Sequence, residues 1–255
     1  MVSIIKFKMI KHFLSSIILI SSVNFFSQKN EGIAIYKAKT SHTFDNIEKE
    51  NEREVLNKIF ENSGKESSIN FKLFFKNEKS VFFVEKALKR ESKKIDFVSI
   101  KAKIIGKIYV DLITKEIVQH REKFGEVFNI NSNLNDHEWI LTKETIKIGN
   151  YTCYKAILKN KGNKKNETIA WYSPKLPYNI GPLGYCGLPG LVIVLKDDVF
   201  IYTLKKISFN LSKQDEKIVI KPNVGKEVSV SEYDSIYKIM RKRKDRLEKE
   251  NYMRN

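Results

Sequence analysis

Two cysteines and three histidines are the residues of this sequence whose types could support nucleophilic catalysis. A thiolate from Cys153 or Cys186 would need a histidine beside it as a base. Outside the N-terminal segment the histidines are His42, His120 and His137. His120 falls in a stretch of alternating apolar residues and His137 in a polar turn, so each is expected to be an ordinary polar side chain. We therefore predict no catalytic residue, and a hydrolase ranks only as a third hypothesis.

The sequence also lacks the enzyme motifs that can be recognised from local spacing. The sequence holds no G-x-x-x-x-G-K-[ST] phosphate loop, no G-x-G-x-x-G, no H-E-x-x-H and no G-x-S-x-G elbow. Asp136-His137-Glu138 offers ligand types, but neighbouring side chains of a strand point to opposite faces and cannot share one ion. Asp197-Asp198 lacks the other spaced oxygens of a calcium loop and fits a hairpin turn. We expect no metal and no cofactor.

The N-terminal segment has the pattern of a secretory signal peptide. Three lysines precede an uncharged run from Phe13 to Phe26. A membrane-spanning helix needs about 20 apolar residues, so the shorter run suits a cleaved signal better than a membrane anchor. We predict a signal peptide at 1–27, ending at Ser27, and a periplasmic or secreted mature chain. Without a cysteine near the cleavage point, we do not expect a lipoprotein.

Export bears on the two cysteines. Cys153 and Cys186 would meet an oxidising compartment, where a disulfide can form and persist. A bridge closing that loop would stabilise the chain by roughly 3 to 4 kcal/mol. The alternative is a pair of unpaired thiols, buried as small apolar groups. The sequence leaves both open.

The chain is strongly basic, with a formal net charge of +17. Lysine, asparagine and isoleucine are abundant throughout, however, so the charge reflects overall composition more than a focused patch. We expect no specific nucleic-acid partner. The mature segment, 28–255, has the length of a single domain with its own core.

Most of the mature chain alternates apolar and polar residues with the period of half-buried strands, separated by short polar turns. We count about ten strands. The fold class is therefore mainly β, as a strongly curved antiparallel sheet or an incompletely closed β-barrel, since so many strands rarely form one flat sheet. Helical periodicity predicts an early helix at 46–62 and a C-terminal helix at about 231–252. Ser231 and Asp234 suggest a capping box for the second helix, and we expect the helices to cover the mouth or the concave face of the sheet.

The polar face of the C-terminal helix is basic. It carries four consecutive cations from Arg241 to Lys244, followed by Arg246. Such a face could make a peripheral contact with anionic lipid. The simpler interpretation is a solvated face on a helix that packs its apolar side on the sheet.

The half of the chain after Trp139 contains a distinctive series of motifs. In order they are Trp139 with Thr145 to Tyr151, Cys153 to Ala156, Ala170 to Pro174, Gly181-Pro182, and Gly187 to Val192. This order resembles the GLPGLI family, signal-bearing proteins of Bacteroidetes-type bacteria named for the hexapeptide, here with Val192 in the last position. The resemblance implies export and a β-rich fold. It implies no catalytic residue, substrate or cofactor.

Proline and glycine dominate the segment before Leu191, so it cannot be an ordinary central strand. One interpretation is a ligand or partner surface on a rigid loop, and the one we favour is an internal plug for a curled sheet. The residues of such a surface would be Trp171, Pro182, Gly187, Leu188, Pro189, Gly190 and Leu191. We predict a non-enzymatic binding or carrier module for an apolar small molecule or peptide. The alternative is an accessory protein that contacts an outer-membrane protein.

Overall fold

The computed structural model describes residues 30–40, 70–84, 105–159, 167–198 and 200–254. The predicted signal peptide at 1–27 and the predicted helix at 46–62 lie outside the described residues. Within the described part of the chain, no helix is both long and apolar enough to cross a membrane.

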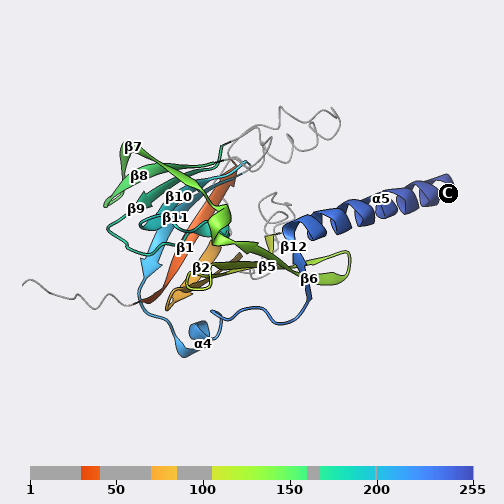
Figure 1. Cartoon of the computed structure of the whole chain (residues 1–255), viewed down its shortest axis with the longest axis horizontal. Helices are drawn as coiled ribbons and strands as arrows, with labels where there is room; N and C mark the ends of the chain where they lie inside the picture. Colours follow the sequence, from red (N-terminus) through yellow and green to blue (C-terminus); the bar gives the residue numbers. More distant parts are fainter. Residues whose placement is uncertain (1–29, 41–69, 85–104, 160–166, 199, 255) are drawn as a thin grey trace, which may run out of the picture.

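The described chain forms one sheet of 12 strands, in the order β12-β6-β5-β4-β3-β2-β1-β11-β10-β9-β8-β7 (Figure 1). In chain order the strands are β1 (Glu31–Thr40), β2 (Asn70–Lys76), β3 (Lys79–Val84), β4 (Lys107–Asp111), β5 (Glu116–Lys123), β6 (Glu126–Asn133), β7 (Trp139–Ile148), β8 (Tyr151–Leu158), β9 (Ile169–Ser173), β10 (Leu191–Lys196), β11 (Phe200–Ser208) and β12 (Lys226–Ser229). The prediction of a mainly β fold is confirmed. The estimate of about ten strands was too low, and the sheet is open, because its order begins at β12 and ends at β7 without closing into a barrel.

The sheet consists of two meanders joined edge to edge. Strands β1 to β6 pair with their sequence neighbours, as do β7 to β11, and the two sets meet where β1 pairs antiparallel with β11. Two-residue turns such as Gly149-Asn150 connect neighbouring strands, which is why local sequence patterns identify them. The short β12 differs. It follows the long segment after β11 and pairs in parallel with β6.

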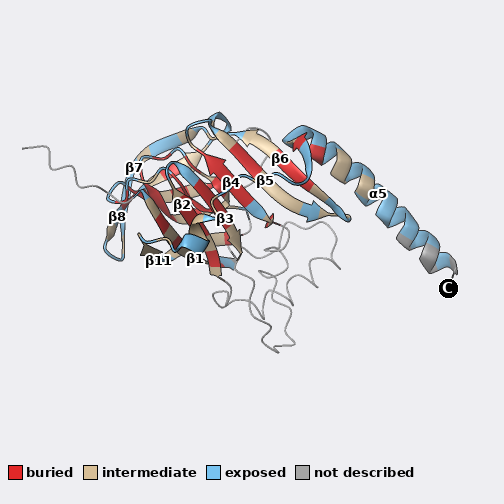
Figure 2. Cartoon of the chain, turned by 90° about the horizontal axis from the view of Figure 1, so that it is seen from below, coloured by how far each residue is buried: buried red, intermediate tan, exposed pale blue. Residues whose placement is uncertain are grey.

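One face of the sheet carries the main core, and we call it the inner face. Cα partners of an antiparallel ladder point to the same side, so the pairs Tyr36↔Phe71 and Leu73↔Phe82 place four large buried side chains together. The buried cluster extends from β5 through β1 to β8 and includes the loop between β9 and β10. Figure 2 shows these buried residues as stripes on the strands.

A smaller cluster lies elsewhere, around Val81, Tyr109 and Val118. Ile218 and Val219 pack against it from the segment after the short helix α4 (Lys213–Glu216). That segment then leads to β12 at the far end of the sheet.

The predicted C-terminal helix is present as α5 (Val230–Arg254). Its N-terminal cap differs from the prediction, because Ser229 and Glu232 make it: the Glu232 amide donates to Ser229 Oγ at 3.2 Å and the Ser229 amide donates to Glu232 Oε2 at 2.7 Å. Ser231 and Asp234 lie two residues further along, inside the first turns.

Only the first turns of α5 pack on the sheet. Tyr233 is buried against Phe128 of β6 and Val228 of β12. The helix then extends past the edge of the sheet (Figure 1), with Ile239 68% and Leu247 50% exposed. We expected this helix to cover the mouth or the concave face of the sheet. Instead, only its first turns contact the sheet, because the rest of the helix extends beyond the sheet edge.

Candidate functional site

The loop between β9 and β10 crosses the inner face, and we call residues 174–190 the plug segment. Four of its side chains, Leu176, Ile180, Cys186 and Leu188, belong to the main buried cluster. Its 3-10 turn, η2 (Pro182–Gly184), contacts β3 and β4. The plug segment therefore connects the two meanders through their shared interior.

Close approach of the backbone explains the glycines of this segment. A Cβ added to Gly184, whose φ is +77°, would lie 2.8 Å from Ile108 Cγ2. A Cβ added to Gly190, whose φ is +152°, would lie 2.3 Å from the Ser173 carbonyl oxygen. Only glycine allows the chain to approach its neighbours this closely at these backbone angles.

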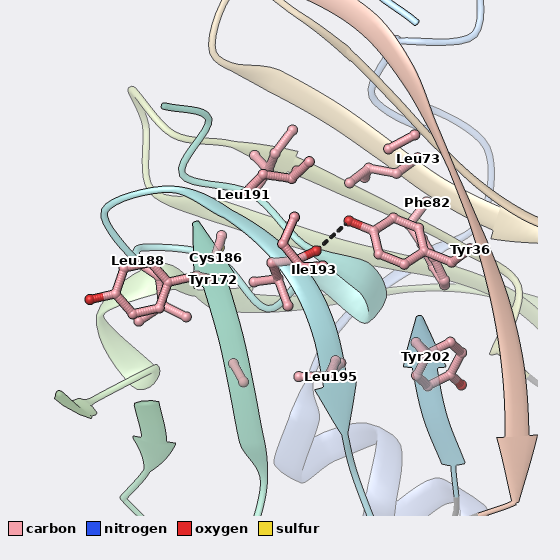
Figure 3. Packing of buried hydrophobic residues seen from close by; sticks show 14 of the residues in the cluster. Tyr36, Leu73, Phe82, Tyr172, Cys186, Leu188, Leu191, Ile193, Leu195 and Tyr202 are labelled. Atoms are coloured by element: carbon pink, nitrogen blue, oxygen red, sulfur yellow. Dashed lines mark hydrogen bonds between the residues drawn. The ribbon is translucent and has the colours of Figure 1, made fainter. Parts of the chain in front are cut away.

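Backbone and side-chain hydrogen bonds hold the plug segment at both ends. The amides of Leu191 and Val192 donate to the carbonyls of Leu176 and Ile180 at 2.8 and 3.1 Å. Tyr36 Oη donates to the Val192 carbonyl at 2.6 Å (Figure 3). Burial raises the pKa of Tyr36 far above its usual range, so the hydroxyl keeps the proton it donates.

The predicted surface residues are mostly internal. Leu188 and Leu191 are 1% and 0% exposed, and Figure 3 shows Leu188 beside Tyr172 in the core. Pro182 and Gly190 are also buried, and Trp171 of β9 is partly buried against the main cluster. Of the hexapeptide, only two residues reach solvent as exposed positions, namely Gly187 and Pro189.

The two cysteines are free and buried, so the structure holds no bridge between them. Cys153 Sγ lies 3.7 Å from the Tyr151 carbonyl oxygen on its own strand, whereas Cys186 Sγ lies 4.0 Å from His137 Nδ1. Each thiol thus has a different neighbour in the structure. Both are among the small, tightly packed groups of the core.

The contact between Cys186 and His137 brings together residue types that can form a nucleophile and a base. Cys186 is 1% exposed, and burial raises the pKa of its thiol to about 12. The protonated form is therefore strongly favoured at neutral pH, and the sulfur can at most donate a weak hydrogen bond to the imidazole. Trp139 Nε1 donates to the Cys186 carbonyl at 2.9 Å, which fixes this part of the plug segment. The geometry describes a packing contact.

Beside the plug segment, the described residues of the inner face form a groove of about 300 Å³. It is lined by Ile105, Ile108, Ile117, Gln119, Ile130, Ser132, His137, Leu183, Tyr185 and Val230. We call it the inner groove. Its apolar floor comes from β4, β5 and β6, one wall from the plug segment, and the remaining side from the start of α5.

The polar groups of the inner groove are few. Gln119 Nε2 donates to the Ile105 carbonyl at 2.9 Å, so its amide is already engaged. The His137 and Tyr185 rings pack against each other with centroids 5.2 Å apart. Burial raises the pKa of the Tyr185 phenol, so this hydroxyl stays protonated. The lining of the groove contains no acidic residue, lysine or arginine.

A large apolar cavity lined by aromatic strand residues, such as Phe71, Phe75, Trp139 and Trp171, would have favoured a carrier. Phe71 is instead fully buried, and Phe75 borders a smaller cavity of about 110 Å³. The isoleucines of the inner groove were missed as a site, although their alternation was visible along β4 to β6. The sequence could not indicate that the plug segment forms a groove with them.

No cluster of three or more metal-ligating side chains occurs in the described part of the chain. The site is defined by shape and by apolar surface. Together, the fold and the inner groove define an open β-sheet protein whose interior holds a plug segment and, beside it, a groove with an apolar floor.

Comparisons with known proteins give two similarities. Residues 158–194, which include the whole plug segment and the start of β10, match the family model described as "Protein of unknown function (Porph_ging)". Two crystal structures of PNGF-II, in the C2 and P21 space groups, share the fold with TM-scores of 0.50 and 0.52 at 18% and 17% identity. These alignments cover 80% and 81% of this chain but 32% and 33% of the PNGF-II chains. No curated protein matches the sequence.

Proposed function

We propose that this chain is a non-enzymatic binding or carrier module of the bacterial envelope, which holds an apolar ligand or an apolar peptide side chain in the inner groove. One observation carries the proposal. The plug segment fills most of the inner face, and beside it lies a groove of about 300 Å³ that Ile108, Ile117 and Ile130 line. A concave site with an apolar floor and few polar groups is typical of ligand-binding grooves.

The size of the groove limits the ligand. Small-molecule sites span roughly 300 to 1,000 Å³, so a groove of about 300 Å³ suits a short acyl chain or one large apolar side chain. Ser132 and His137 could orient a polar head group.

Filling the groove should abolish binding. Ser132 faces the same side of the sheet as its partner Ile117, so Ser132→Trp would place an indole inside the groove. We expect titration with a fluorescent medium-chain fatty acid to show at least about a tenfold weaker Kd for this variant. Glu126→Trp, at an exposed position on the same strand, is the matched control and should bind like the parent protein.

Native mass spectrometry of protein purified from its own cells complements this titration. A co-purified small molecule that Ser132→Trp loses would identify the ligand. An unaltered affinity of Ser132→Trp for the fatty acid, with a folded circular dichroism spectrum, would contradict the proposal.

The remaining expectations rest on the sequence. Cleavage after residue 27, a periplasmic location and membership of the GLPGLI family are part of the same proposal. N-terminal sequencing of the mature protein from the periplasmic fraction tests the first two. A peripheral contact of α5 with the membrane is a separate alternative.

A further inference from the structure

A second groove lies between the edge strand β12 and helix α5. It has a volume of about 430 Å³. Lys226 and Val228 line it on the strand side, and Ser231, Ser235 and Ile236 line it on the helix side. We call it the edge groove. Because β12 ends the strand order, its outer edge pairs with no other strand of the described residues.

The strand that borders the edge groove is held firmly in place. Glu227 accepts hydrogen bonds from Asn129 Nδ2 and Asn131 Nδ2 of β6, both at 2.7 Å. Ser229 then caps α5 together with Glu232. The edge of β12 and the helix that follows it therefore keep a fixed relative position, as a docking site requires.

The helix face that borders the groove continues beyond it as a basic surface. Residues three, four, seven or eleven positions apart share a face of an α-helix. Counting from Ser235, this rule places Ile239, Lys242 and Arg246 on the groove side of α5. Ile239 is 68% exposed, and the two basic side chains are exposed as well. The neighbouring glutamates of the groove are already engaged, Glu227 by β6 and Glu232 by Ser229.

We propose that the edge groove binds an extended peptide by strand addition to β12, and that acidic residues of the peptide contact the basic face of α5. An exposed strand edge offers the unpaired backbone groups that an added strand needs. Ile236 and Ile239 provide apolar contacts for the peptide's side chains, while Lys242 and Arg246 select for negative charge. This site is separate from the inner groove and does not depend on the function proposed for it.

The test uses the full chain and two synthetic fluorescent peptides. One has alternating valine and threonine followed by four glutamates, and the other has four lysines in their place. Fluorescence anisotropy should show binding of the acidic peptide, at least roughly tenfold tighter than the basic one, at moderate salt. Equal binding of the two peptides, or no binding of either, would overturn the proposal.

Variants on the two sides of α5 locate the contact. Arg246→Glu should weaken binding of the acidic peptide by roughly fivefold or more, whereas Arg241→Glu, the same change at an exposed position on the far face, should alter it by less than about twofold. Ser235→Trp should block the groove, and Ser132→Trp should leave peptide binding unchanged.

Membrane binding by α5 is the alternative, and vesicle binding measures it separately. If α5 were instead a membrane contact, vesicles containing phosphatidylserine would bind the chain and Arg241→Glu and Arg246→Glu would weaken that binding alike. That result, combined with a peptide affinity insensitive to Ser235→Trp, would replace strand addition by lipid binding.

Discussion

Single residues of the plug segment decide whether the two meanders can share one interior. Gly190 is the sharpest case, since its backbone passes Ser173 with no room for a side chain. The sequence predicted that the plug segment is not a regular strand, because it is rich in proline and glycine. It could not predict that Gly190 contacts Ser173, because the contact partners of a loop depend on tertiary structure.

Replacing Gly190 by alanine should destabilise the fold by about 2 to 3 kcal/mol, since a Cβ would overlap the Ser173 carbonyl at an unfavourable φ. Gly125→Ala is the control. Its φ is also positive, at +79°, but no atom lies within 4 Å of the added Cβ, so a loss of about 1 kcal/mol is expected. Urea unfolding of both variants measures the difference, and equal losses would show that contact with Ser173 is unimportant.

The buried thiols make a second prediction at this scale. Burial raises the pKa of Cys186 to about 12 and also raises that of Cys153, so both should resist Ellman's reagent at pH 8 in the folded protein. Both should react once the protein is unfolded in denaturant without reductant. Absence of free thiols in that unfolded sample would mean that the two cysteines are bridged after all.

At the scale of elements, the strands were the most predictable feature and β12 the least. Alternation along β1 to β11 reveals each strand locally. β12 has four residues and one buried side chain, Val228, so it leaves almost no pattern. Its position comes from a parallel ladder with β6 and from the Glu227 hydrogen bonds, which connect residues nearly a hundred positions apart. The true cap of α5 was missed for the same reason, since Ser229 belongs to a strand that the sequence does not show.

The attachment of β12 should depend on pH. Hydrogen bonds from Asn131 and Asn129 lower the pKa of Glu227. A carboxyl whose pKa is lower in the folded state stabilises it above the unfolded pKa of about 4.3, and the contribution is lost as pH falls through the folded value. Glu227→Gln should therefore lower the Tm at pH 7 and have a smaller effect at pH 3.

Comparison with a neighbouring carboxylate makes this prediction specific. Glu122→Gln, at an exposed position on β5, should change the Tm little at either pH. If Glu227→Gln lowered the Tm as much at pH 3 as at pH 7, the loss of stability would come from packing and not from the charge of Glu227.

For the whole molecule, the sequence predicted the class of fold but not its outline. Local alternation indicates many antiparallel strands, and it cannot say whether the first and last strands of such a series meet. Here β1, the first strand, pairs with β11, so β7 and β12 form the two edges and the sheet stays open. The edge groove follows from this arrangement, because β12 is an edge strand.

The similarity to part of PNGF-II fits this description at the level of fold alone. About a third of each PNGF-II chain aligns with four fifths of this one. About two thirds of each PNGF-II chain lies outside the alignment, and any activity of the longer chain says nothing about the grooves described above.

The pairing of β1 with β11 also constrains the order of folding. Tyr36 pairs with Leu204 of β11 and donates to Val192 of β10, 156 positions away, so the N-terminal meander gains its central neighbour only after most of the chain has been synthesised. Contacts of such long range form slowly, and until they form the β1 edge and Tyr36 are exposed to other chains. A chain built this way benefits from being kept unfolded until it is complete.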